Sequence, residues 1–370
     1  MIFYVVILAT LSILLISSWL LESNMPVIIM GIIMIVTAGL RYNTGFDYDS
    51  YHMVYSEIAN GTTLSSITPH FESGFMMLNW CAIQLGISFN LFLLFFSGLT
   101  LGLLTLFLVK LNDPELASMA LYYYFVRFFF TRDMGQIRSS FAAVVCLFAI
   151  RSMIREKRYR AILLVLLASF FQKVALILLV TFVLVYLIKK HLNILTFLIV
   201  TILTGITSKV ISGLLTSHAE LLGDYSTYIT ADSFISGSGL SNPVIWMQFF
   251  IGLIAIIVFY QITSGVNRRQ FLTDAVDQSL ESIQYVVAIY IVGMLILILL
   301  NQLPTAAGRT STVLNTVEIL IIPLIIRRCV SRMLQLPVFM FLAVVVWYVF
   351  FMHMELLNFI PYTSSLGVFD

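Results

Sequence analysis

Charged residues are scarce in this sequence. They make up 10% of its 370 residues, whereas 60% are hydrophobic. Soluble domains carry about 25% charged residues, so this chain has too few to cover a surface that faces water. Apolar runs of about 20 residues, long enough to cross a bilayer, recur from one end to the other. The composition predicts an all-α polytopic membrane protein that contacts membrane lipid and has no nucleic-acid partner.

Cysteine and histidine are also few. Cys81, Cys146 and Cys329 lie far apart inside apolar segments, which predicts neither a disulfide framework nor a metal site. The five histidines have no metal-ligand spacing, and no phosphate-binding loop or dinucleotide fingerprint occurs. The sequence therefore predicts no metal and no cofactor.

Twelve apolar segments are predicted to span the membrane. They lie near 2–21, 24–40, 89–109, 114–131, 136–154, 159–172, 174–188, 192–213, 243–263, 283–303, 310–326 and 334–352. The first lacks the basic start and the small-residue cleavage site of a signal peptide. The piece at 74–87 is too short to span and is predicted to be a re-entrant or interfacial helix. No repeat divides the chain, so residues 1–370 are predicted to form a single bundle.

The basic residues predict the orientation, because cytoplasmic loops are rich in lysine and arginine. Thirteen of the twenty basic residues fall in five segments that can all face the cytoplasm if the piece at 74–87 does not cross. The outer loops 41–73 and 214–242 and both termini then lie on the opposite face. The seven other basic residues lie on that face or just beneath it: Arg41, Arg127, Arg132, Arg138, Lys173, Lys209 and Arg309.

Cations placed against the usual bias suggest an anionic ligand. Arg41, Arg138 and Arg309 stand at the ends of predicted spans, where guanidinium groups can hold phosphate oxygens in bidentate fashion. Arg132 and Lys173 are further candidates for the same ligand. The alternative is that each arginine reaches a lipid headgroup or pairs with an aspartate such as Asp47 or Asp133.

The outer loop at 41–73 also carries acids and aromatic residues. Glu72 is the preferred candidate for a general base, ahead of Asp47, with His70 close by in sequence. The alternatives are a helix cap for Glu72 and a turn residue for Asp47. Tyr42, Tyr48 and Tyr51 are candidates for stacking on sugar rings, although tyrosines near a membrane surface more commonly form an aromatic belt.

Four blocks of the sequence are similar to one known family. GLRYNTGFDYDSY with FESGFMMLNWCAIQLG, QIRSSFAAVVCLFAI with LVLLASFFQKVALI, GRTSTVLNTVEILIIP, and NFIPY occur in this order. Together they resemble the EpsG-like family of Wzy-type polysaccharide repeat-unit polymerases. Gln172 stands where that family commonly has histidine, Ser139 replaces a glutamine, and Val313 and Leu314 replace an aromatic pair.

The resemblance implies an enzyme of the bacterial inner membrane with its active site on the outer, periplasmic face. Such an enzyme transfers a growing glycan from undecaprenyl pyrophosphate to a second lipid-linked repeat unit, without a metal. The arginines would bind the pyrophosphate, and Gln136 and Gln172 would join the tyrosines at the glycan. A chain-length regulator and a flippase would be partners. A lipid-linked oligosaccharide flippase and an O-antigen ligase are the alternative functions.

Overall fold

A computed structural model of the chain describes residues 1–63, 66–67, 71–218, 239–261, 274–352 and 359–369. These residues form two compact units. Unit 1 comprises Met1–Val145, Phe170–Gln172 and Val330–Asp370, and unit 2 comprises Cys146–Ser169 and Lys173–Cys329.

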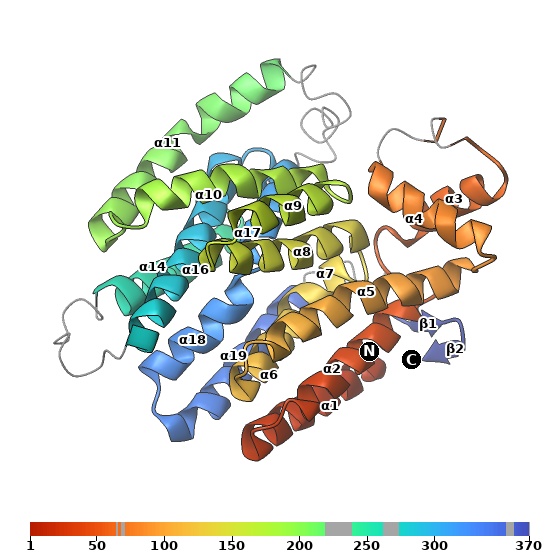
Figure 1. Ribbon diagram of the computed structural model, residues 1–370, viewed down its shortest axis with the longest axis horizontal. Helices are drawn as coiled ribbons and strands as arrows, with labels where there is room; N and C mark the ends of the chain where they lie inside the picture. The colour runs from red at the N-terminus through yellow and green to blue at the C-terminus, as the bar shows by residue number, and fades with distance from the viewer. Residues whose placement is uncertain (64–65, 68–70, 219–238, 262–273, 353–358, 370) are drawn as a thin grey trace. The chain divides into compact units, whose positions relative to one another are not determined.

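Helices account for almost all of the regular structure in both units (Figure 1). Unit 1 contains α1 (Ile2–Leu21), α2 (Met25–Gly39), α3 (Tyr48–Ala59), α4 (Ser73–Gln84), α5 (Phe89–Val109), α6 (Pro114–Tyr124), the π-helix η1 (Phe125–Phe129), α7 (Phe130–Arg132) and α19 (Arg332–Met352). Helix α8 (Ile137–Ile154) begins in unit 1 and ends in unit 2. Unit 2 contains α9 (Arg158–Ser169), the 3₁₀ helix η2 (Lys173–Leu176), α10 (Ile177–Ile188), α11 (Ile194–Ser217), α14 (Pro243–Ile256), the π-helix η4 (Ile257–Gln261), α16 (Asp274–Leu299), α17 (Pro304–Asn315) and α18 (Glu318–Cys329).

Polar residues before the helices set where several of them begin. The Asp113 carboxylate accepts a hydrogen bond from Leu116 N at 3.0 Å, with Pro114 at the first helical position of α6. Asn242 caps α14 in the same way, through Val244 N at 3.0 Å. Such caps satisfy backbone donors that the first turn leaves without a partner. They mark helix starts inside a sequence whose apolar character is otherwise uniform.

Helices α1, α2, α5 and α6 pack side by side in unit 1 (Figure 1). The contact between α2 and α5 is close because two glycines of α2 face α5. A Cβ added at Gly31 would overlap Thr105 Oγ1, and one at Gly39 would lie 2.7 Å from the Cα of Leu94. Small residues let membrane helices approach in this way. The approach fixes the end of α2, from which Arg41 follows.

A β-hairpin near the C-terminus closes one end of unit 1. Its strands β1 (Tyr362–Ser364) and β2 (Gly367–Phe369) are antiparallel. The Tyr362 ring stacks on Phe3 with centroids 4.1 Å apart, and the Tyr4 hydroxyl donates to Phe359 O at 2.8 Å. The start of α1 and the C-terminal segment therefore lie at the same end of unit 1.

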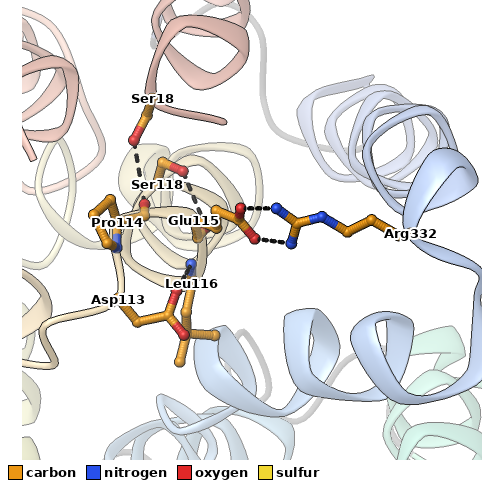
Figure 2. A network of polar contacts seen from close by, with 7 residues as sticks. All are labelled: Ser18, Asp113, Pro114, Glu115, Leu116, Ser118 and Arg332. Carbon is orange, nitrogen blue, oxygen red and sulfur yellow. Dashed lines mark hydrogen bonds and ion pairs between the residues drawn. The ribbon is translucent and has the colours of Figure 1, made fainter. Parts of the chain in front are cut away.

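An ion pair joins α6 to α19 at the other end of α1, as Figure 2 shows. The Arg332 guanidinium donates to both oxygens of Glu115, whose side chain is almost fully buried. Ser18, near the end of α1, donates to Pro114 O at 3.2 Å, and Arg332 lies 4.6 Å from the ring centroid of Trp19. The starts of α6 and α19 and the end of α1 thus meet at one point.

Helix α16 is central to unit 2, where it contacts α10, α11, α14, α17 and α18. Helices α17 and α18 are separated by a break with a bend of 56°. Buried polar groups lie at this break: Asn315 donates to Gln248 at 2.8 Å, and Tyr290 donates to Glu318 at 3.2 Å. The predicted span 310–326 is therefore two helices.

The structure does not confirm the predicted count of twelve spans. Seven described helices are long and apolar enough to cross a membrane, or eight if the bent pair of α17 and α18 counts as one span. Four other predicted spans are short or broken: 24–40 forms the 15-residue α2, 114–131 is interrupted by η1, 159–172 forms the 12-residue α9, and 174–188 begins as η2. Apolar composition indicates burial but does not reveal such breaks. The piece at 74–87 forms the short helix α4, and its re-entrant or interfacial position stays a prediction.

Candidate functional site

Arg41 lies in a short extended segment that pairs with the C-terminal hairpin. Tyr42 N donates to Thr363 O at 2.8 Å, and Ser365 N donates to Leu40 O at 2.9 Å. Backbone hydrogen bonds on both sides of Arg41 hold its main chain in place. The side chain is directed into unit 1 and is fully buried, with 0% of its surface exposed.

The buried guanidinium of Arg41 has few hydrogen bonds. Its Nη1 donates to Ala38 O. Within the described part of the chain, Nε and Nη2 have no hydrogen-bond acceptor. A cation taken out of water without an ion pair costs several kcal/mol. Burial accordingly lowers the pKa of Arg41, while the nearby Tyr51 and Asp133 act in the opposite direction.

Two glycines bring the Arg41 segment against the turn before α8. Gly45 has φ +106°, and a Cβ there would overlap Met134 O. A Cβ at Gly135 would lie 2.5 Å from Thr131 O. Only glycine combines this backbone conformation with such close contact. The TGFD motif at 44–47 thus serves to pack two polar segments together.

Asp133, in that turn, is buried, with 3% of its surface exposed. The Tyr124 hydroxyl donates to Oδ2 at 2.7 Å and the Ser140 hydroxyl to Oδ1 at 2.8 Å. Burial raises the pKa of Asp133 to about 6, although these hydrogen bonds and the charges of Arg132 and Arg41 lower it. The sequence suggested Asp133 only as an ion-pair partner for an arginine. The sequence signal that indicates the burial of Asp133 is its position directly after an aromatic-rich segment, in FFFTRD.

Glu72 and Arg138 form an ion pair inside unit 1. Glu72 occupies the position before α4, but its side chain makes no capping hydrogen bond, unlike the alternative expected from sequence. The Arg138 guanidinium lies 4.4 Å from the ring centroid of Phe71, a cation–π contact. The carboxylate proposed as a base is thus held by the arginine proposed to bind phosphate.

Tyr51, on α3, is buried near Arg138, whose guanidinium carbon lies 5.9 Å from the Tyr51 ring centroid. Both Arg138 and Arg41 act on its hydroxyl, and burial raises the pKa of Tyr51 to about 12. Asp47, half-buried at the start of α3, acts on both Tyr51 and Arg138. Unit 1 therefore brings together Arg41, Tyr51, Arg138, Glu72 and Asp47.

The start of α4 is held by the segment that precedes Gln172. Gly74 N donates to Phe170 O at 2.9 Å, and a Cβ at Gly74 would lie 2.7 Å from the same oxygen. Phe171 packs on Phe141 with ring centroids 4.5 Å apart. Gln172, which is buried, is thereby placed in unit 1 with Glu72.

The remaining predicted residues of unit 1 differ in exposure. Tyr42 is 52% exposed, so its ring is accessible, whereas Tyr48 is enclosed at 5% and contacts Phe89. Arg132 is buried over the Phe128 ring at 3.9 Å, and Gln136 is half-buried. Among the tyrosines predicted to stack on sugar, Tyr42 alone has an exposed ring.

Unit 2 holds the other predicted cations. Lys173 is exposed in η2, and Arg309 is half-buried in α17. Their convergence with Arg41 and Arg138 stays a prediction. His70 and residues 219–238 of the loop 214–242 lie outside the described residues. In the described ranges, no group of three histidine, cysteine, aspartate or glutamate side chains could hold a metal ion.

Comparison with known proteins finds a match to a family model. The model described as the EpsG family matches residues 24–364, nearly the whole chain. No similar protein is found among curated proteins or among solved structures. The match begins just before α2 and ends with β1, so it includes every residue of the buried cluster around Arg41. The chain belongs to the EpsG family, a Wzy-like polymerase family.

Proposed function

We propose that this protein is a repeat-unit polymerase of the bacterial inner membrane with its active site on the periplasmic face. It transfers a growing glycan from undecaprenyl pyrophosphate to the terminal sugar of a second lipid-linked repeat. Family membership supports polysaccharide repeat-unit polymerisation. The observation that carries the chemistry is Arg41, a fully buried guanidinium with two nitrogens that lack acceptors among the described residues.

The reaction requires a stabilised leaving group. The acceptor hydroxyl oxygen attacks the anomeric carbon of the donor sugar, the bond from that carbon to the pyrophosphate oxygen breaks, and the hydroxyl loses its proton. Negative charge develops on the leaving pyrophosphate, and prepositioned cations in dry surroundings lower the barrier. Arg41 and Arg138 are the groups proposed to bind it. Pyrophosphate is already a good leaving group, so the proposal needs no metal.

Glu72 receives a role that depends on Arg138. In the structure the two form an ion pair, which leaves the carboxylate poorly placed to accept a proton. A diphosphate that binds Arg138 would compete with Glu72 for the guanidinium. The released carboxylate could then accept the proton of the acceptor hydroxyl. Donor binding and base activation would be a single event.

The twelve-span topology belongs to this proposal, with the short helices also crossing. Arg41 follows α2 and lies beside the C-terminal hairpin, at the same end of unit 1 as the start of α1. If α1 crosses the membrane, α2 must cross back. The interrupted segment 114–131 also runs from one end of unit 1 to the other. Glu115, near its start, pairs with Arg332, and Met134, just after its end, contacts Gly45.

A reconstituted assay with one lipid-linked repeat tests the function. We expect the wild type to produce a ladder of longer glycans, also in the presence of a chelator. Arg41→Gln should reduce chain growth about 100-fold or more, the usual cost of removing one donor to a developing oxyanion. Arg127→Gln is the control, because this arginine lies over the rings of Phe128 and Phe350.

Two results would contradict the proposal. Undiminished chain growth by folded Arg41→Gln protein would remove this arginine from the mechanism. Movement of the lipid-linked repeat across the bilayer without new glycosidic bonds would indicate a flippase instead.

A further inference from the structure

Three side chains, those of Asp133, Tyr124 and Ser140, form a closed ring of hydrogen-bonding contacts. Tyr124 and Ser140 each contact one carboxylate oxygen, at 2.7 and 2.8 Å, and their two hydroxyl oxygens lie 2.9 Å apart. Tyr124 ends α6, and Ser140 lies in the first turns of α8. All three side chains are buried, and the ring brings together three segments of unit 1.

The number of protons in this ring depends on the state of Asp133. Each hydroxyl has one proton to donate, and each can also accept. With an ionised carboxylate, both protons point to Asp133, and the contact between Tyr124 and Ser140 has none. With a protonated carboxyl, each of the three contacts contains one proton. The ring can therefore hold Asp133 in either state, and the neutral state completes its hydrogen bonds.

The charged groups that face Asp133 come from two further segments. Arg132 precedes it at the end of α7, and Arg41 approaches through the contact between Gly45 and Met134. Tyr124 is the other titratable neighbour. With Asp133 ionised, these two arginines and the aspartate carry a net charge of +1. With Asp133 neutral, the charge rises to +2.

We propose that Asp133 is the proton-linked partner of Arg41, which takes up a proton when an anionic diphosphate binds. The inference rests on the proposed function, because it takes the ligand of Arg41 to be a diphosphate. A negative ligand beside Arg41 disfavours the ionised form of Asp133, and by reciprocity protonation of Asp133 favours the ligand. Tyr124 and Ser140 accommodate the change by rotating their hydroxyls. Asp133 therefore acts on the ligand through Arg41 and does not touch the reacting atoms.

The direction of the pH dependence follows. Burial raises the pKa of Asp133 to about 6. Below this pH the site is already neutralised at Asp133 and binds the anion most tightly. As the pH rises above it, binding requires the uptake of one proton, so the Kd should increase by up to about tenfold per pH unit.

The test is a titration with a short-chain prenyl diphosphate esterified to one sugar. Each phosphate of this probe carries one ester bond, one anhydride bond and a single strongly acidic oxygen, so its own charge is constant between about pH 5 and 8. For the wild type we expect the Kd to rise with pH and calorimetry in two buffers of different ionisation enthalpy to report proton uptake. In Asp133→Asn the amide replaces the neutral carboxyl, so the Kd should be independent of pH and close to the wild-type value at pH 5. Asp49→Asn, at an exposed carboxylate on α3, is the control and should keep the wild-type pH dependence.

The outcomes separate the two proposals. Binding without pH dependence and without proton uptake would overturn the role of Asp133 and leave the polymerase proposal intact. No binding at any pH would overturn the diphosphate site itself, and the proton linkage with it. If Asp133→Asn does not fold, the wild-type proton uptake decides.

A second measurement needs no ligand. Infrared titration of protein labelled with ¹³C in its aspartate carboxyl groups follows the ionisation of all nine aspartates, and the difference between wild type and Asp133→Asn isolates that of Asp133. Arg41→Gln removes a positive charge, so the titration midpoint should rise by about one pH unit. Arg127→Gln should not change it. An unchanged midpoint in Arg41→Gln would refute the coupling.

Discussion

Glu72 and Arg138 form an ion pair in which each buried charge depends on the other. Removing one partner of a buried pair costs about 3–5 kcal/mol, whereas removing both costs much less. We expect Glu72→Gln and Arg138→Gln each to lower the melting temperature of the detergent-purified protein clearly. The double variant should recover most of that loss. Thermal unfolding followed by intrinsic fluorescence measures all three variants.

In the Glu72 and Arg138 variants, we expect polymerisation activity not to follow stability. The double variant lacks both the proposed base and one phosphate ligand, so polymerisation should stay absent even where stability returns. Glu57→Gln, a partly exposed carboxylate on α3, is the control for the loss of one acid. If the double variant regains chain growth, the pair is purely structural and Glu72 is not the base.

The residues of the site differ in how far sequence could predict them. Arg41 and Arg138 stand out as cations at span ends, and their residue type alone suggests an anionic ligand. The burial of Arg41 depends on Thr363, more than 300 positions away, and on the fit of Gly45 against Met134. The pairing of Glu72 with Arg138 likewise arises from tertiary packing. Local sequence contains no signal for contacts of this kind.

At the scale of elements, the contact between α2 and α5 yields a prediction with an internal control. In Gly39→Ala the new Cβ would lie 2.7 Å from the backbone of Leu94, so the helices must move apart. Overpacking of this kind costs about 1–3 kcal/mol. Gly102→Ala, in α5, places its Cβ where no atom lies within 4 Å. We expect a lower melting temperature for Gly39→Ala and an unchanged or slightly higher one for Gly102→Ala, and equal values would contradict the close packing.

The junction of α6 and α19 gives a second test at this scale. Arg332→Gln leaves the nearly buried Glu115 without its bidentate partner (Figure 2). The Arg332 side chain is 58% exposed, so solvent screens the pair and the expected loss is modest, about 1 kcal/mol. Arg328→Gln, at an exposed arginine of α18, should have no effect. The melting temperature of each variant measures its loss of stability. Equal losses in Arg332→Gln and Arg328→Gln would contradict the prediction.

Elements were predictable where an apolar run coincides with one unbroken helix. The bounds of α1 and α5 match the predicted spans residue for residue, because polar or turn-forming positions flank both runs. The interruption of the predicted span 114–131 was not predictable, because its aromatic run YYYFVRFFF continues the apolar pattern through a π-helix. The break between Asn315 and Glu318 is similarly hidden, since each of these two buried side chains has a polar partner on another helix.

At the scale of the whole molecule, the meeting of the two chain ends limits the topology. Phe3 stacks on Tyr362, so we expect these residues to share one side of the membrane and the chain to cross an even number of times between them. This expectation favours eight or twelve crossings over seven. Phe170 contacts Gly74, close to the Glu72–Arg138 pair. This contact places Phe170 at the end of unit 1 that is proposed to face outward. The basic segment at 151–160 is assigned to the cytoplasm by its charge.

Labelling of single cysteines decides whether α9 crosses. In a background with Cys81, Cys146 and Cys329 replaced by serine, an impermeant maleimide should label Leu366→Cys and Phe170→Cys in intact spheroplasts. Tyr159→Cys should react only after permeabilisation; the three native residues are 77%, 58% and 88% exposed. Residue 159 lies in the first turn of α9 and residue 170 directly after its end, so labelling from opposite sides requires that this 12-residue helix cross the membrane. Labelling of both residues from the same side would mean that α9 and α10 do not cross the membrane. The topology would then have ten spans, because removing two spans keeps the even number expected from the contact between Phe3 and Tyr362.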